Sequence, residues 1–152
     1  GEDMHRIMQL GASAVQLGTL FVTTKECDAS PAFKQSYVQA KEEDMEIIVS
    51  PVGMPGRAIR NEFLDSVKRG EKKPIHCPVK CIKTCDVETT PYCIISALMN
   101  AYKGKLESGY AFAGSNAFRA TEINTVKEVM DRLVSEYEQV EQRTRTRESV
   151  LA

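Results

Sequence analysis

The 152-residue sequence lacks several features that mark whole classes of protein. No apolar run approaches the roughly 20 residues that a membrane-spanning helix needs. Basic residues (20) and acidic residues (21) nearly balance, so there is no basic field of the kind that attracts nucleic acid or a membrane surface. These absences predict a water-soluble domain that has neither a nucleic acid nor a membrane as its partner.

Signals for export and for self-contained catalysis are also missing. The first ten residues mix both charges around no apolar stretch, which is unlike a secretory leader, and they resemble the interior of a longer sequence. The cysteine count of five is odd, which without a leader favours reduced thiols in a cytoplasmic protein. No paired carboxylates and no nucleophile with a neighbouring base occur, so the pattern predicts no catalytic residue.

What remains is a chain of one domain's length with 42% hydrophobic residues. Periodicity, capping residues and breakers predict its elements. They are a helix over Met4–Leu10 ended by Gly11, a buried parallel strand over Ala14–Leu17, a helix from Pro31 to about Lys41 capped by Ser30, a strand over Met45–Ser50, a loop over Pro51–Gly56, an amphipathic helix over Ala58–Arg69, a helix over Tyr92–Lys103, a short apolar stretch over Tyr110–Ala113, and a final helix over Val126–Val140 capped by Asn124 or Thr125. The sequence therefore predicts an α/β fold with more helix than strand.

Three regions follow from this order. Residues 1–30 form a helix and strand unit with a turn, residues 31–142 form a mostly helical lobe, and residues 143–152 form a polar, frayed tail. The lobe contains a cysteine-rich insertion over residues 71–93.

The insertion spaces three thiols four residues apart, at Cys77, Cys81 and Cys85, with Cys93 following eight residues later. Thiolates are good ligands for zinc or an iron–sulfur cluster, and His76 lies beside the first of them. The paired Cys-x2-Cys signature of structural zinc is absent, however, and free cysteine is among the most often buried residue types. The sequence alone favours packed, unreactive thiols and no metal site, and it leaves a cysteine-based metal-binding or interaction module as an alternative.

Gly18 and Thr19 follow the predicted strand at Ala14–Leu17. Backbone N–H groups at the end of a parallel strand, with the positive end of a following helix, suit a phosphate group. Gly18 lets an anion approach the backbone closely, and Thr19 adds a hydroxyl donor. By the pattern alone, a strand that merely ends in Gly-Thr is the more frequent explanation.

The segment Gly11–Thr19, followed by Phe21 and Thr24–Cys27, resembles the last barrel strand of the nitronate monooxygenase family, formerly called 2-nitropropane dioxygenase. Flavin-type enoyl-acyl-carrier-protein reductases share it. Ser50–Asn61 is similar to the conserved stretch that follows in this family, and Tyr110–Arg119 with Val126–Val129 is similar to its closing segment. The resemblance therefore covers most of the chain.

The resemblance implies the C-terminal fragment of a (β/α)8 FMN-binding barrel plus a mostly helical lobe. In this family the main chain of Gln16, Leu17, Gly18 and Thr19 helps to hold the FMN phosphate. The implied activity is oxidation of a small nitronate or nitroalkane with O2, carried by the flavin. The enzymatic alternative is reduction of an enoyl thioester.

Parts of the family pattern differ or are missing here. Leu20 stands where many members have arginine, and Ser115-Asn116 stands where many have Gly-Gln. The glycine-rich phosphate loop and the catalytic histidine of the family would precede Gly1, and neither His5 nor His76 matches the latter. We therefore expect the isolated chain to bind FMN weakly or not at all, and to lack a catalytic base. An unpaired strand also predicts a homo-oligomer.

Overall fold

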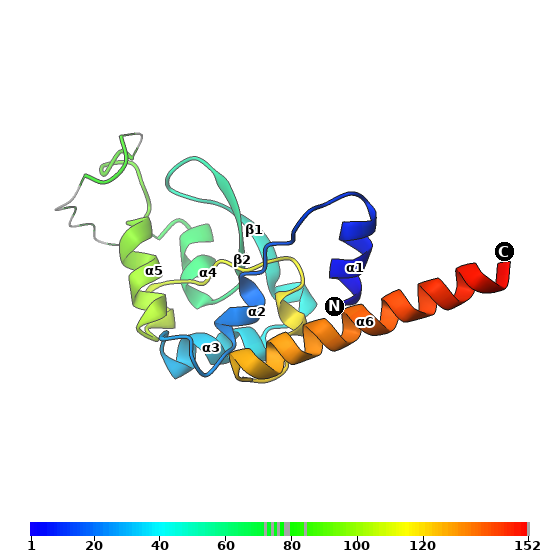
Figure 1. Cartoon of the computed structure of the whole chain (residues 1–152). Coiled ribbons are helices and arrows are strands. Elements are labelled where there is room, and N and C mark those ends of the chain that lie inside the picture. Colours follow the sequence, from blue (N-terminus) through cyan, green and yellow to red (C-terminus); the bar gives the residue numbers. More distant parts are fainter. Residues whose placement is uncertain (72, 74, 76, 78–79, 84, 152) are drawn as a thin grey trace.

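A computed structural model describes the chain except residues 72, 74, 76, 78–79, 84 and 152. Helices surround one small antiparallel hairpin (Figure 1) made of β1 (Met45–Val49) and β2 (Pro55–Ile59). Met45 pairs with Ile59 and Val49 pairs with Pro55. The mixture of helix and strand confirms the α/β class, and no barrel is formed within the described residues.

The hairpin corrects two predicted elements. The loop predicted over Pro51–Gly56 and the helix predicted from Ala58 are wrong where β2 occupies Pro55–Ile59. A tight turn explains the difference, because Gly53 takes φ +83 and its N–H donates to the carbonyl of Ser50. The turn brings β2 back onto β1, and pairing overrides the helical spacing of the apolar residues after it.

The helix α4 therefore begins later than predicted, and spans Glu62–Lys68. Its N-cap is Asn61, whose side-chain oxygen accepts a hydrogen bond from the N–H of Leu64 at 3.1 Å. The amide nitrogen of Asn61 donates to the carbonyls of Leu106 and Gly109, which fixes this corner to the distant segment after α5 (Ile94–Tyr102).

The predicted helices near the N-terminus are confirmed. In α1 (Glu2–Gln9), Gly11 follows the end at φ +98, and the N–H groups of Gly11 and Ala12 donate to the carbonyls of Met8 and Ile7. In α3 (Pro31–Gln39), the Ser30 hydroxyl accepts from the N–H of Phe33. These local signals set the helix ends to within about two residues of the expectation.

The predicted strand over Ala14–Leu17 is wrong, because these residues have no regular secondary structure and lie largely exposed. A strand requires hydrogen bonds to a neighbour. In the part of the chain that the structure describes, β1 pairs with β2, the only other bridges join Thr24 to Asn124 and Ala58 to Phe112, and none involves Ala14–Leu17. The segment instead leads directly into the single turn of α2 (Thr19–Val22).

Two apolar clusters form the core. One joins the hairpin, α4 and α5, and stacks the ring of Phe63 near those of Tyr92 and Tyr110 at centroid distances of 5.1 and 6.0 Å. The other joins α3, the end of β2 at Ile59, Ala111 and η3 (Ala117–Arg119), and it includes the buried ring of Tyr37. Two further short turns, η1 (Glu42–Asp44) and η2 (Leu106–Ser108), connect these elements.

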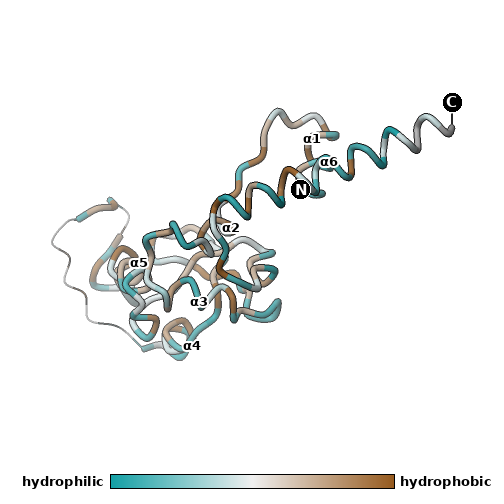
Figure 2. The backbone as a smooth tube through the Cα atoms, turned by 60° about the horizontal axis from the view of Figure 1, so that its bottom comes forward, coloured by the Kyte–Doolittle hydropathy of each residue, from teal (hydrophilic) through white to brown (hydrophobic). Residues whose placement is uncertain are grey.

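The last helix, α6 (Val126–Leu151), is longer than predicted. The helical start is confirmed, since the Thr125 hydroxyl and the Glu128 carboxylate cap each other's N–H groups. The predicted frayed tail over residues 143–152 is wrong up to Leu151: Arg145 pairs with Glu141 at 2.8 Å, and the Thr144 hydroxyl donates to the carbonyl of Val140. The far half of α6 projects from the body and is mostly hydrophilic (Figure 2).

Tyr37 gives an alkaline test of this core. Its hydroxyl donates to the carbonyl of Phe112 at 2.6 Å, and burial raises the pKa of Tyr37 to about 12. The unfolded chain ionises this group near pH 10, so its contribution is present below that pH and is lost as the pH rises toward 12. We expect Tyr37→Phe to lower the free energy of unfolding by about 1 kcal/mol at pH 8. Urea unfolding at pH 8 and 11.5 should show a smaller gap in this free energy between the variant and the parent at the higher pH. A gap of equal size at both pH values would contradict this.

Candidate functional site

The turn at Gly18 and Thr19 lies on the surface, between the irregular segment 12–17 and α2. A Cβ built on Gly18 would meet no atom within 4 Å, so nothing inside the chain requires glycine there. Among the described residues, no hydrogen bond is made by the N–H groups of Gly18, Thr19 or Leu20. The turn thus presents unpaired donors beside open space, which is what an incoming anion requires.

Thr19 is held by a segment almost one hundred residues away. Its Oγ1 accepts a hydrogen bond from the N–H of Gly114 at 3.0 Å. A hydroxyl that accepts one bond retains its own proton to donate. The contact brings the Gly114–Asn116 turn against the predicted phosphate site. The sequence resemblance singles out both segments but gives no sign of this contact.

The buried side chain of Lys34 binds the loop that follows α2. The Nζ of Lys34 donates to the carbonyls of Thr24 and Cys27 at 2.8 and 2.7 Å, and its side chain is buried. The Thr24 hydroxyl in turn donates to the carbonyl of Phe21 at the end of α2, at 2.8 Å. The sequence offered no signal for Lys34, because an isolated lysine on a helix is ordinarily solvated. Cys27 is half-buried.

Gln16 and Leu17, the other two predicted cofactor-binding residues, are exposed and form no wall around the turn. Leu17 keeps 40% of its surface accessible. The structure therefore brings Thr19 together with Gly114, and leaves Gln16 and Leu17 open to whatever packs over residues 12–18.

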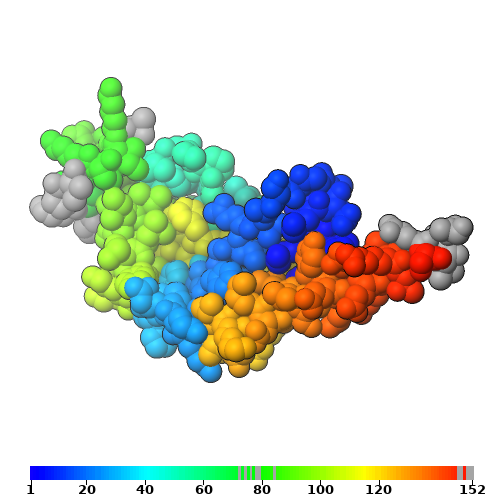
Figure 3. All heavy atoms as spheres, viewed as in Figure 1, coloured from blue at the N-terminus to red at the C-terminus, as the bar shows by residue number. Residues whose placement is uncertain are grey.

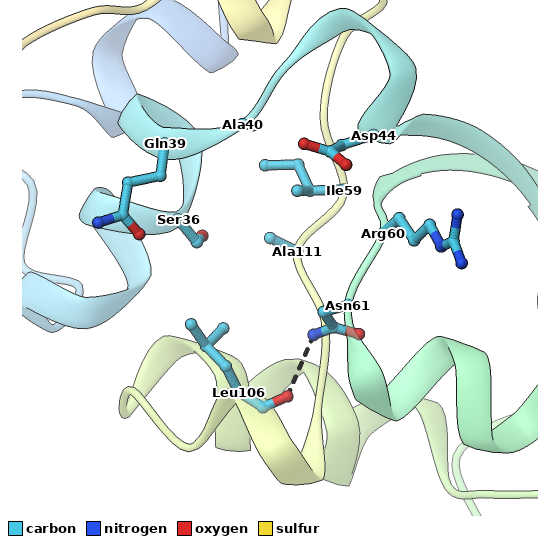
Figure 4. A pocket seen from close by; sticks show the side chains of 9 residues that line it. All are labelled: Ser36, Gln39, Ala40, Asp44, Ile59, Arg60, Asn61, Leu106 and Ala111. Carbon is cyan, nitrogen blue, oxygen red and sulfur yellow. Dashed lines mark hydrogen bonds between the residues drawn. The ribbon is translucent and has the colours of Figure 1, made fainter.

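A separate pocket of about 200 Å3 lies between α3, the end of β2 and η2 (Figure 4). Two of its polar side chains are already engaged, since Asn61 caps α4 and Arg60 turns outward to Asp65 at 3.0 Å. The Arg60 guanidinium lowers the pKa of the Asp65 carboxyl. Arg60 is thus held in an ion pair at the surface and does not point into the pocket. None of the predicted cofactor-binding residues lines this pocket.

Only one of the two histidines, His5, lies among the described residues. His5 is buried between α1 and α6, with its ring 5.2 Å from that of Tyr137, which is a packing role. Figure 3 shows α1 lying against the middle of α6. His76 lies outside the described residues. Over the residues that can be assessed, no helix has the length and apolar character to cross a bilayer.

Comparison with known proteins places this geometry in a family. The family model for nitronate monooxygenase matches residues 1–136. A probable nitronate monooxygenase of Staphylococcus haemolyticus is 32% identical over 127 residues, which are 84% of this chain and 33% of that protein. Another, from Staphylococcus saprophyticus, is 34% identical over 80 residues, or 53% of this chain and 22% of that protein.

Solved structures agree with the family match. FabK from Thermotoga maritima superposes with a TM-score of 0.75 at 26% sequence identity, covering 96% of this chain and 43% of that chain. A point mutant of the same protein superposes with a TM-score of 0.72. The chain spans about a third of the length of the Staphylococcus haemolyticus protein. The match over nearly its whole length shows that the chain belongs to the nitronate monooxygenase family.

Proposed function

We propose that this chain is the C-terminal portion of an FMN-dependent oxidoreductase that oxidises small nitronates or nitroalkanes with O2. The observation that supports it most directly is the Gly18–Thr19 turn, whose unpaired N–H groups and open glycine fall within the matched family region. Because the chain spans only a third of the Staphylococcus haemolyticus relative, the proposal assigns the rest of the barrel, the glycine-rich phosphate loop and the catalytic base to the remainder of such a full-length protein. Segment 12–18, which has no ladder partner among the described residues, would become a barrel strand in that protein.

The turn fits the phosphate of FMN on three counts. A Cβ at Gly18 would fill the open space that the phosphate needs. The N–H groups of Gly18 and Thr19 are available to donate, and the proton of the Thr19 hydroxyl is still free to do so. Leu20 stands where many members have arginine, so in this proposal the turn holds the phosphate with backbone and hydroxyl donors.

The flavin supplies the redox chemistry when it is bound, and this chain's residues hold and orient it. The Gly114 N–H fixes the rotamer of Thr19, and Lys34 fixes the loop that follows α2. Both contacts limit the movement of the phosphate donors, and this in turn limits movement of the bound cofactor.

FMN binding by the complete protein tests the turn. We expect Gly18→Val to weaken FMN binding by roughly 10- to 100-fold, because the side chain occupies the phosphate position and removes charge-assisted hydrogen bonds. Thr19→Val should weaken binding by about tenfold, whereas Thr19→Ser, which keeps the hydroxyl, should stay close to the parent. Quenching of flavin fluorescence on titration measures all three. The exposed Thr121→Val serves as the matched control.

The reaction is tested on the same protein. Oxygen consumption with a nitronate, and without NAD(P)H, supports the proposal. Loss of NADH with a crotonyl thioester and no oxygen uptake would instead assign the chain to an enoyl-thioester reductase, the enzymatic alternative that the sequence resemblance leaves open. Wild-type FMN affinity in Gly18→Val would remove the turn from the cofactor site whichever reaction is found.

A further inference from the structure

The segment Ala111–Gly114, here called the strap, runs antiparallel beside β2. The N–H of Ile59 donates to the carbonyl of its first residue (Figure 4), and the N–H of its third residue donates to the carbonyl of Arg57, both at 3.0 Å. Successive residues of an extended chain direct their backbone groups to opposite edges. The backbone groups of Phe112 and Gly114 therefore face the edge of the strap that lies away from β2.

Two side chains from distant parts of the sequence occupy this other edge. The hydroxyl of Tyr37 on α3 donates to the carbonyl of Phe112 at 2.6 Å. Two residues further on, the N–H of Gly114 donates to Oγ1 of Thr19 at 3.0 Å. The strap therefore connects a residue of the core to the turn that we propose to hold the FMN phosphate.

Tyr37 is the fixed end of this connection. Its side chain is only 2% exposed, and its ring lies 5.4 Å from that of Phe33, measured between centroids. The helix that carries it is capped by Ser30. Because packing leaves the ring in one orientation, its hydroxyl determines where the Phe112 carbonyl lies.

The opposite end of the strap is much less enclosed. Gly114 is exposed, and its carbonyl accepts a hydrogen bond from the N–H of Ala117 in η3 at 3.1 Å. The ring of Phe112 packs over β2, where a Cβ on Gly56 would overlap it. These contacts hold the face and the far end of the strap, whereas Tyr37 holds the edge on which Thr19 lies. Without the Tyr37 hydroxyl, that edge keeps only the exposed bond to Thr19.

We propose that Tyr37 is a positioning residue for the cofactor site, which acts on Thr19 through the strap. The role rests on the proposed function, in which the Thr19 hydroxyl donates to the phosphate of FMN. A hydroxyl has one proton to donate, and the bonds that its oxygen accepts limit where that proton can point. By holding the Phe112 carbonyl, Tyr37 keeps the Gly114 N–H on Thr19 and leaves the proton for the phosphate. Donors that are already fixed bind an anion more tightly, because less freedom is lost on binding.

The phosphate dependence of flavin binding tests this role in the complete protein. Riboflavin lacks the phosphate, so the ratio of FMN affinity to riboflavin affinity isolates the phosphate site. We expect Tyr37→Phe to lower this ratio by about three- to fivefold, less than the roughly tenfold loss expected of Thr19→Val. Quenching of flavin fluorescence gives both affinities. Tyr92→Phe is the matched control, because it removes a buried tyrosine hydroxyl from the other apolar cluster and should leave the ratio unchanged.

A double variant separates positioning from a general loss of stability. If Tyr37 acts through Thr19, then Tyr37→Phe should have no further effect on the ratio once Thr19→Val is present. Equal losses from Tyr37→Phe with and without Thr19→Val would overturn this route.

The chain without flavin supplies an independent readout. In Tyr37→Phe, the Gly114 amide should exchange its hydrogen about fivefold faster, because its bond to Thr19 opens more often. The NMR couplings of Thr19 should show averaging between rotamers, while the amides of α5 should exchange as in the parent. Unchanged exchange at Gly114 would contradict the proposal.

The two proposals can fail separately. A complete protein that binds FMN no more tightly than riboflavin would overturn the phosphate site and, with it, the role of Tyr37. A parent that prefers FMN, with the same preference in Tyr37→Phe, would overturn the role of Tyr37 alone and leave the proposed cofactor site in place.

Discussion

Gly109→Ala should destabilise the chain by about 3 kcal/mol or more, a large part of the roughly 5–15 kcal/mol that holds a domain together. A Cβ on Gly109 would overlap the carbonyl oxygen of Ala97, and would lie 2.9 Å from the backbone nitrogen of Ala101. Both alanines are fully buried on α5, so the chain after η2 crosses this helix with main chain against main chain. Backbone atoms cannot move aside as the end of a flexible side chain can.

Urea unfolding followed by circular dichroism measures the effect. The matched control is Gly18→Ala, since a Cβ there meets no atom within 4 Å and the φ of −115° suits any residue. It should change the free energy of unfolding by less than about 0.5 kcal/mol. Similar losses in the two variants would show that Gly109 matters for chain entropy rather than for close packing.

Lys34→Met should lower the free energy of unfolding by about 2–4 kcal/mol. Methionine keeps the length and the apolar stem, but leaves the carbonyls of Thr24 and Cys27 without the ammonium that now donates to both. These carbonyls are shielded from water by the side chain that serves them, because Lys34 is itself buried. Removing one partner of a buried polar contact costs more than the contact contributed, since the other partner stays desolvated.

Lys127→Met provides the comparison for this change. Lys127 is exposed and pairs only with Asp131 one turn along α6, so its replacement should cost less than about 0.5 kcal/mol. Hydrogen exchange locates the damage: in Lys34→Met, amides of α2 and residues 24–27 should exchange faster while those of α5 do not. Uniform acceleration over the whole chain would mean that Lys34 supports the core in general and not the loop beside the proposed cofactor turn.

Helix ends in this protein were determined by sequence. Ser30 before Pro31, the Thr125 and Glu128 pair, and Gly11 after α1 each act through hydrogen bonds within four residues. Such signals need no tertiary partner, so the sequence alone predicts α1, α3 and the start of α6 correctly. The family was also determined by sequence, because the Gly11–Thr19 and Ser50–Asn61 segments carry it.

Strands depended on partners instead. Ala14–Leu17 has the composition of a buried strand, yet it takes no regular structure where no neighbour offers hydrogen bonds. Pro55–Ile59 has unfavourable strand residues, yet it pairs along its whole length because the Gly53 turn returns it to β1. The composition of a segment indicates which side chains a strand could bury. Only the tertiary structure determines whether a neighbouring strand is present to form its hydrogen bonds.

The candidate sites show the same division. The sequence predicted Gly18 and Thr19 as phosphate donors. Only the tertiary structure placed the N–H of Gly114 on the Thr19 hydroxyl and set Lys34 against the loop that follows α2. The physical reason is separation along the chain. Hydrogen-bond donors and acceptors far apart in sequence converge through the packing of elements, and no local pattern of residues records that convergence.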